Sequence, residues 1–131
     1  MNLRYQSWFE QAKKDMEWAK DSHDRGHYAQ TCFICQQIGE KALKSYAYYL
    51  GNEMIKSHSI VAIAKATNIN GEIQKAGQKL DLYYMSSRYP DAVPDMGIPS
   101  DYFNEDQSKE ALDLAEIILT KIEQAIFKPK V

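Results

Sequence analysis

The sequence contains no long apolar run and few cysteines. No stretch of its 131 residues approaches the roughly 18 uninterrupted apolar residues that a membrane-spanning helix requires. Its first five residues lead into no apolar segment of the signal type. Cys32 and Cys35 are too few for a disulfide framework and suit a reducing compartment. We therefore expect a cytoplasmic protein that makes no membrane contact.

Strand-like alternation, internal repeats and low-complexity segments are also missing from the sequence. Apolar residues recur instead at helical spacing, and 44% apolar with 26% charged residues is ordinary for a globular protein. The length suits one domain. We predict a single all-α domain over residues 1–131, built as an antiparallel up-and-down four-helix bundle with a short additional helix, about five helices in all.

The most apolar predicted helix covers residues 28–50. Two adjacent apolar rows leave little of its circumference polar, so it should lie at the centre of the bundle. The first helix should begin at Ser7, with Glu10 completing a capping box, and end at Gly26. The other predicted helices begin after a cap at Ser57, run from about residue 72 to residues 86–87, and run from residues 105–108 to a stop at Pro129.

One long connection separates the last two helices. Three prolines forbid regular helix between about residues 88 and 101, and such a loop exceeds the roughly two to eight residues usual in helical bundles. Its aromatic and apolar residues are unlike those of a solvated linker. We therefore expect it to pack across the bundle, close to any functional site. These residues are Tyr89, Val93, Met96, Ile98 and Tyr102.

Polar residues interrupt the apolar rows of the central helix between Gln36 and Lys44. This polar seam has two interpretations. It is either a solvated face joined by ion pairs or a partly buried group in which the Glu40 carboxylate requires a cationic partner. For the second interpretation we predict Arg88 as the partner, since its planar guanidinium matches a carboxylate in a bidentate manner.

Three segments together resemble the HEPN family (higher eukaryotes and prokaryotes nucleotide-binding). They are the run of residues 36–44 (QQIGEKALK), the Ser57-His58-Ser59-Ile60 helix start and Arg88-Tyr89-Pro90-Asp91. Their order and spacing extend over nearly the whole chain. The resemblance implies an antiparallel four-helix core with a short extra helix, commonly as a homodimer. It also implies nucleotide binding, partnership with a minimal nucleotidyltransferase in a toxin–antitoxin-like pair, or RNA cleavage.

The ribonuclease branch of that family carries an Arg, a polar residue and, after four to six further residues, a His. Arg88 matches the Arg, but no histidine follows it anywhere in the chain. Metal-independent attack by a 2′-OH needs a group that exchanges protons near neutral pH, usually His. We therefore predict a non-catalytic binding and dimerisation module. The alternative is a metal-independent RNA endonuclease acting across a homodimer interface, with Arg88 catalytic and His58 or His27 supplied by the other chain.

A nucleotide needs cations for its phosphate and an aromatic face for its base. No Gly-rich phosphate loop is present, so affinity should be modest. We expect no cofactor and no metal, and we interpret Cys32 and Cys35 as core residues. His58 either hydrogen-bonds a helix start or contacts a phosphate or a partner. The ligand-binding candidates are Gln37, Glu40, Lys41, Lys44, His58, Tyr84, Arg88, Tyr89 and Asp91.

Overall fold

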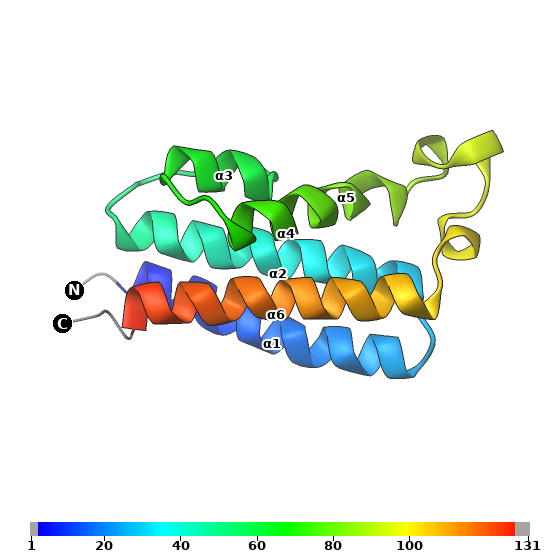
Figure 1. The fold of residues 1–131 in the computed structure, drawn as a ribbon, viewed down its shortest axis with the longest axis horizontal. Helices are drawn as coiled ribbons and strands as arrows, with labels where there is room; N and C mark the ends of the chain where they lie inside the picture. The colour runs from blue at the N-terminus through cyan, green and yellow to red at the C-terminus, as the bar shows by residue number, and fades with distance from the viewer. Residues whose placement is uncertain (1–2, 128–131) are drawn as a thin grey trace.

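The computed structural model describes residues 3–127, which are helical without strands (Figure 1). Four helical rods form an up-down-up-down bundle, so that α1 begins and α6 ends at the same end of it. The predicted fold class is confirmed. The rods are α1 (Arg4–Asp24), α2 (Tyr28–Tyr49), α4 (Glu72–Asp81) continued by α5 (Tyr83–Ser86), and α6 (Glu105–Phe127), and the short additional helix is α3 (Ile60–Ala66).

The central position predicted for the second helix is confirmed, because α2 contacts α1, α3, α4, α5 and α6. Its inward residues, among them Ile38 and Ala42, are fully buried. Each buried isoleucine stabilises the fold by about 1.5–3 kcal/mol. The two cysteines also lie in this core. Burial raises the pKa of Cys32 to about 12 and that of Cys35 further, so both thiols remain protonated at neutral pH.

Two glycines allow α3 to approach the bundle closely. A Cβ on Gly39 of α2 would lie 2.5 Å from Cδ1 of Ile60, and a Cβ on Gly77 of α4 would lie 2.7 Å from its Cγ2. Ile60 is the first residue of α3 and is fully buried between these helices. This contact fixes the start of α3, and with it the preceding residues His58 and Ser59.

Two predicted helix starts are wrong. Helix α1 begins at Arg4, and Ser7 lies inside it, donating its backbone N–H to the Leu3 carbonyl at 3.1 Å. Ser59 rather than Ser57 caps α3, since its Oγ accepts from the Ala62 N–H at 3.0 Å. In both cases the serine predicted as the cap lies three residues from the first residue of the observed helix.

The predicted stop at Gly26 is confirmed, because this residue follows α1 with a φ of +82° that glycine adopts without strain. The predicted fourth helix is divided at Leu82 into α4 and α5. The predicted stop at Pro129 lies outside the described residues. None of the helices described is long and apolar enough to cross a membrane.

The expectation that the proline-rich loop packs across the bundle is correct only in part, because residues 99–102 contact α2 and Val93 and Pro99 are buried, but the loop does not lie across the helices. The loop lies at one end of the bundle (Figure 1) and forms three short 3₁₀ turns, η1 (Pro90–Ala92), η2 (Pro94–Met96) and η3 (Pro99–Tyr102). Each turn begins with a proline, whose fixed φ suits a first helical position. The Tyr102 hydroxyl donates back to the Pro94 carbonyl at 3.0 Å. The loop therefore folds on itself, and Met96 and Ile98 remain about two-thirds exposed.

Candidate functional site

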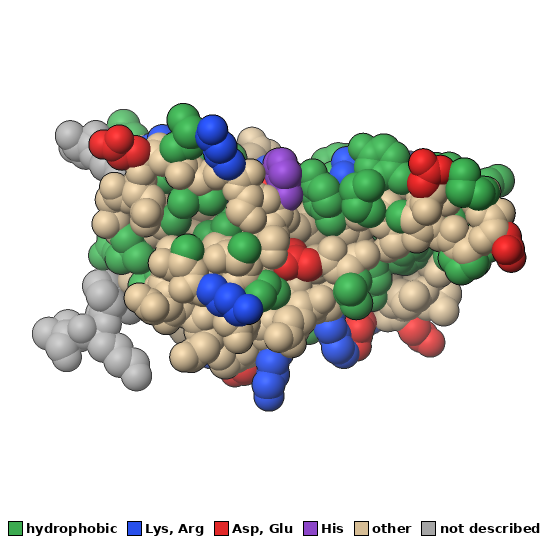
Figure 2. Space-filling view, turned by 90° about the horizontal axis from the view of Figure 1, so that it is seen from above, with side chains coloured by type: hydrophobic (Ala, Val, Ile, Leu, Met, Phe, Trp, Pro, Cys, Tyr) green, Lys and Arg blue, Asp and Glu red, His purple; other side chains and the backbone are tan. Residues whose placement is uncertain are grey.

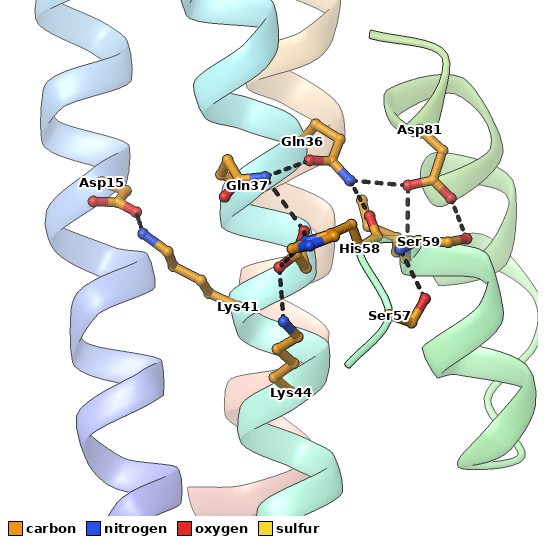
Figure 3. Close-up of polar contacts among 11 residues, drawn as sticks. Asp15, Gln36, Gln37, Lys41, Lys44, Ser57, His58, Ser59 and Asp81 are labelled. Atoms are coloured by element: carbon orange, nitrogen blue, oxygen red, sulfur yellow. Dashed lines mark hydrogen bonds and ion pairs between the residues drawn. The ribbon is translucent and has the colours of Figure 1, made fainter. Parts of the chain in front are cut away.

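Asp81, near the end of α4, organises the start of α3 (Figure 3). Its carboxylate accepts hydrogen bonds from the backbone N–H groups of Ile60 (2.9 Å) and Val61 (3.1 Å) and from Ser59 Oγ (2.9 Å). A carboxylate at this position satisfies N–H groups that have no partner within the helix. Asp81 therefore holds the segment that carries His58 in place.

Gln36 extends this arrangement to α2. Its fully buried side chain donates to Asp81 Oδ1 at 3.1 Å and to the His58 carbonyl at 2.8 Å. Gln37 donates to the carbonyl oxygen of the Gln36 side chain at 2.8 Å and to Glu40 Oε1 at 3.3 Å. A buried amide is stabilised when its donors and acceptor are all used. The polar seam is thus a hydrogen-bonded network that joins α2, α3 and α4.

Glu40 pairs with Lys44, not with Arg88, so the predicted Glu40–Arg88 pair is wrong. Lys44 Nζ donates to Glu40 Oε2 at 2.9 Å, and both side chains are more than nine-tenths buried. Nδ1 of His58 lies 3.4 Å from each Glu40 oxygen. The four-residue helical spacing already places Lys44 beside Glu40, so no distant cation is required. The carboxylate is buried and paired with a cation, which favours the second interpretation of the seam over a solvated face.

Arg88 follows α5 and lies among aromatic rings. Its guanidinium carbon is 4.1 Å from the ring centroid of Phe33, 4.6 Å from that of Tyr84 and 4.8 Å from that of Tyr89. Its Nε donates to the Tyr84 carbonyl at 3.0 Å. Within residues 3–127 it has no carboxylate partner in an ion pair. Stacking of this kind orients a guanidinium without neutralising its charge.

A groove of about 450 Å³ opens beside Arg88. Phe33 and Ile34 of α2 lie on one side, and Ile98 and Pro99 of the loop on another. Ligand sites commonly enclose about 300–1,000 Å³ and combine apolar walls with a few polar groups. The groove has that character, because its lining combines apolar side chains with a few polar ones. The remaining lining residues are Trp18, Gln30, Ser87 and Ser100.

The candidate residues taken from the sequence divide into a cluster and two outliers. His58 stacks on Tyr84 with ring centroids 5.3 Å apart and planes 17° apart, so His58, Tyr84, Arg88 and Tyr89 are contiguous. Gln37, Glu40 and Lys44 adjoin this cluster through His58. Lys41 turns away to pair with Asp15 of α1. Asp91 is exposed on η1, away from these contacts.

Sequence reasoning missed Asp81 as an organising residue and Phe33 and Trp18 as groove residues. Asp81 meets Ser59 only through tertiary contact, and Phe33 carries no feature that distinguishes it from core aromatics. No local signal in the sequence could have identified them. Within the described residues, no group of three or more His, Cys, Asp and Glu side chains could hold a metal ion.

Comparison with known proteins places the chain in a family. The family model for the HEPN domain matches residues 5–125. The chain belongs to the HEPN family. The predicted resemblance is therefore confirmed, and the cluster around Arg88 lies within the matched segment of this HEPN domain. No curated protein matches the chain.

Three solved structures share the fold of this HEPN domain. TT1696 from Thermus thermophilus is 34% identical with a TM-score of 0.86, and the match covers 95% of this chain and 98% of that one. ST0689, an archaeal HEPN homologue, is 34% identical with a TM-score of 0.82 over 96% and 99% of the two chains. An HEPN domain protein from Thermotoga maritima, tm0613, is 24% identical with a TM-score of 0.74 over 94% and 99%, which supports the fold alone.

Proposed function

We propose that this HEPN domain is a non-catalytic module that binds a nucleotide at Arg88. The observation that carries the proposal is the environment of this side chain. Three aromatic rings and one carbonyl orient the guanidinium, no carboxylate within residues 3–127 neutralises it, and a groove adjoins it. An oriented, unneutralised guanidinium is suited to bidentate contact with phosphate.

The groove supplies a place for the base. Its volume of about 450 Å³ is in the range of small-molecule sites. Phe33 and Trp18 offer aromatic surface, and Gln30 and Ser100 offer hydrogen-bonding groups in its lining. With the phosphate at Arg88, a base in the groove would contact both the aromatic rings and the hydrogen-bonding side chains.

The local charge permits an anion although the net charge of the chain is −2. Two carboxylates close to the cluster are already engaged, Glu40 by Lys44 and Asp81 by the start of α3. Each is therefore partly compensated and repels a phosphate less than a free carboxylate would. With one arginine as the main contact and no phosphate loop, affinity should be modest and should fall as salt rises.

We also propose that the domain forms a homodimer, and an exposed apolar surface supports this part of the proposal. Hydrophobic side chains gather over α5 and the loop turns (Figure 2), and they include Leu82, Met85 and Met96, which are between about one-half and three-quarters exposed. Apolar patches of this kind mark protein interfaces. We propose that a second copy covers this surface, and that a minimal nucleotidyltransferase protein is the further partner, as in toxin–antitoxin-like pairs.

Thermal unfolding with added AMP, ATP and GTP tests the nucleotide site. Wild type should be stabilised with the logarithmic dependence on ligand concentration expected of one-site binding, and Arg88→Ala should lose that stabilisation without losing its fold. Arg25→Ala is the matched control, since Arg25 is exposed and paired with Asp21 at 3.0 Å. Equal stabilisation of wild type and Arg88→Ala would refute the site.

The same proteins incubated with RNA test the non-catalytic part. Metal-free cleavage that disappears in Arg88→Ala would establish the endonuclease alternative instead. Intact RNA after incubation with wild type supports the binding module.

A further inference from the structure

We infer that Asn70 is a modification site, at which the backbone nitrogen of Gly71 converts the asparagine to aspartate and isoaspartate while the domain remains folded. The two residues lie in the turn that joins α3 to α4 (Figure 1). Neither belongs to the cluster around Arg88, so the site is independent of the proposed function. The only co-reactant that it needs is water.

The reaction is an intramolecular attack on the side-chain amide. The Gly71 nitrogen loses its proton to hydroxide and bonds to Cγ of Asn70, and the bond between Cγ and Nδ2 breaks as ammonia leaves with a proton from water. The product is a cyclic succinimide. Water opens the ring at Cγ to give aspartate, or at the main-chain carbonyl carbon to give isoaspartate, in which the chain continues through Cγ. Because both groups belong to one dipeptide, little entropy is lost in bringing them together.

Gly71 presents an unhindered nucleophile. It is exposed, it has no Cβ to shield its nitrogen, and its N–H donates to no acceptor among residues 3–127. It immediately precedes α4 with a φ of +74°, a conformation that favours glycine. The fold therefore requires glycine after Asn70, and the reactive dipeptide is a consequence of the way in which α4 begins.

The side-chain amide of Asn70 is also available for the reaction. It is exposed, and it makes no hydrogen bond within the described residues. Two other exposed asparagines are held in place, since the Asn52 side chain donates to the Ala47 carbonyl at 3.0 Å and the Asn104 side chain accepts from the Gln107 N–H at 2.9 Å. Exposure alone therefore does not distinguish Asn70, whereas its lack of a partner does.

Asn68 provides a matched comparison in the same turn. It is exposed, and its side chain likewise makes no hydrogen bond within residues 3–127. Its nucleophile would be the Ile69 nitrogen, whose N–H already donates to the Ala64 carbonyl at 2.8 Å. Isoleucine also carries a branched Cβ beside that nitrogen. The two asparagines therefore differ in the nitrogen that follows them, and attack on Asn70 breaks no native hydrogen bond.

Both products add one negative charge to a chain whose net charge is −2. The new carboxylate lies directly before the first turn of α4, where backbone N–H groups without partners in the helix favour negative charge. The modified domain should therefore remain folded and be retained longer than the unmodified domain by an anion-exchange column.

Incubation of the folded protein in H₂¹⁸O at neutral pH over several weeks tests the inference, because each carboxyl group that forms takes up label from the water. Trypsin cleavage after Lys65 and Lys75 in ordinary water releases one peptide that contains both Asn68 and Asn70, and fragmentation assigns the label to either residue. Label should appear at Asn70 at least about tenfold faster than at Asn68, because attack by the Ile69 nitrogen first requires a hydrogen bond to open.

A parallel incubation in guanidinium chloride determines whether the folded state itself reacts. If the attack required global unfolding, the folded protein would react at least about a thousandfold more slowly than the unfolded chain, because a stable domain is unfolded for no more than that fraction of the time. We expect the folded protein to react less than about a hundredfold more slowly, because only local motion of the turn is needed.

Asn70→Gln is the control variant, because glutamine would have to close a larger ring. Label at position 70 of folded wild type, absent from a folded Asn70→Gln, supports the inference. Equal rates at Asn68 and Asn70 overturn it. So does a reaction at Asn70 that is more than about a hundredfold slower in the folded protein than in the unfolded chain. The unfolding midpoint of Asn70→Gln verifies that the control is folded.

Discussion

Replacing Glu40 by alanine should destabilise the fold strongly, because it leaves Lys44 charged and buried. The Lys44 side chain is 8% exposed and that of Glu40 is 5% exposed, with Nζ and Oε2 2.9 Å apart. The substitution also removes the carboxylate that faces His58 and the acceptor of one Gln37 hydrogen bond. It therefore disturbs both the core and the site.

The magnitude follows from the partner left behind. Breaking a buried ion pair by removing one partner costs about 3–5 kcal/mol. The Lys44 ammonium lies 5.4 Å from the Trp8 ring, and such a contact offsets about 0.5–2 kcal/mol. We expect a loss of about 3 kcal/mol in the free energy of unfolding, which for a domain of this size lowers the unfolding midpoint by about 10 °C.

Urea and thermal unfolding monitored by circular dichroism measure this loss. Asp113→Ala is the control, because Lys109 and Asp113 form a pair with the same four-residue spacing at 64% and 65% exposure and should contribute only a few tenths of a kcal/mol. Glu40→Ala combined with Lys44→Met should be more stable than Glu40→Ala, since no buried charge remains. A Glu40→Ala cost as small as that of Asp113→Ala would refute the buried pair.

Two further predictions concern packing and association. Gly77→Ala should destabilise the fold by about 1–3 kcal/mol, although alanine has the better helix propensity, and should cost more than Gly39→Ala. The new Cβ at position 77 would meet Cγ2 and Cβ of Ile60, whereas the one at position 39 would meet the terminal Cδ1, which can rotate. Urea unfolding ranks the two variants, and the reverse order would contradict this packing. Met96→Lys should shift a dimer toward monomer, because it places a charge in the exposed apolar surface; sedimentation velocity measures this, and an unchanged dimer would mean that the interface lies elsewhere.

The main helices could be predicted because their signals are local. The apolar rows of α2 and the φ of +82° at Gly26 follow from periodicity and from the conformational freedom of glycine. The cap of α3 could not be chosen in the same way. Ser57 and Ser59 both precede the helix, and the choice of Ser59 depends on Asp81, which is 22 residues away along the chain.

The residues of the candidate site could be predicted from the sequence better than the contacts that they make with one another. The sequence indicated that Glu40 is buried and that Arg88 matters, but it placed them together. Arg88 instead lies among rings contributed by α2, α5 and the residue that follows it, and these rings could be assembled only by the fold. The loop contacts α2 through η3 but does not lie across the bundle, because its prolines favour local 3₁₀ turns.

The most direct test of Arg88 as a phosphate contact uses the arginine side chains themselves. The chain has three arginines, Arg4, Arg25 and Arg88, so a two-dimensional ¹⁵N NMR spectrum should resolve their Nε–H signals, with Arg88→Lys identifying that of Arg88. Titration with AMP should shift the Arg88 signal progressively and leave that of Arg25 in place. An unmoved Arg88 signal at saturating AMP, or equal shifts at Arg25 and Arg88, would contradict the proposed site.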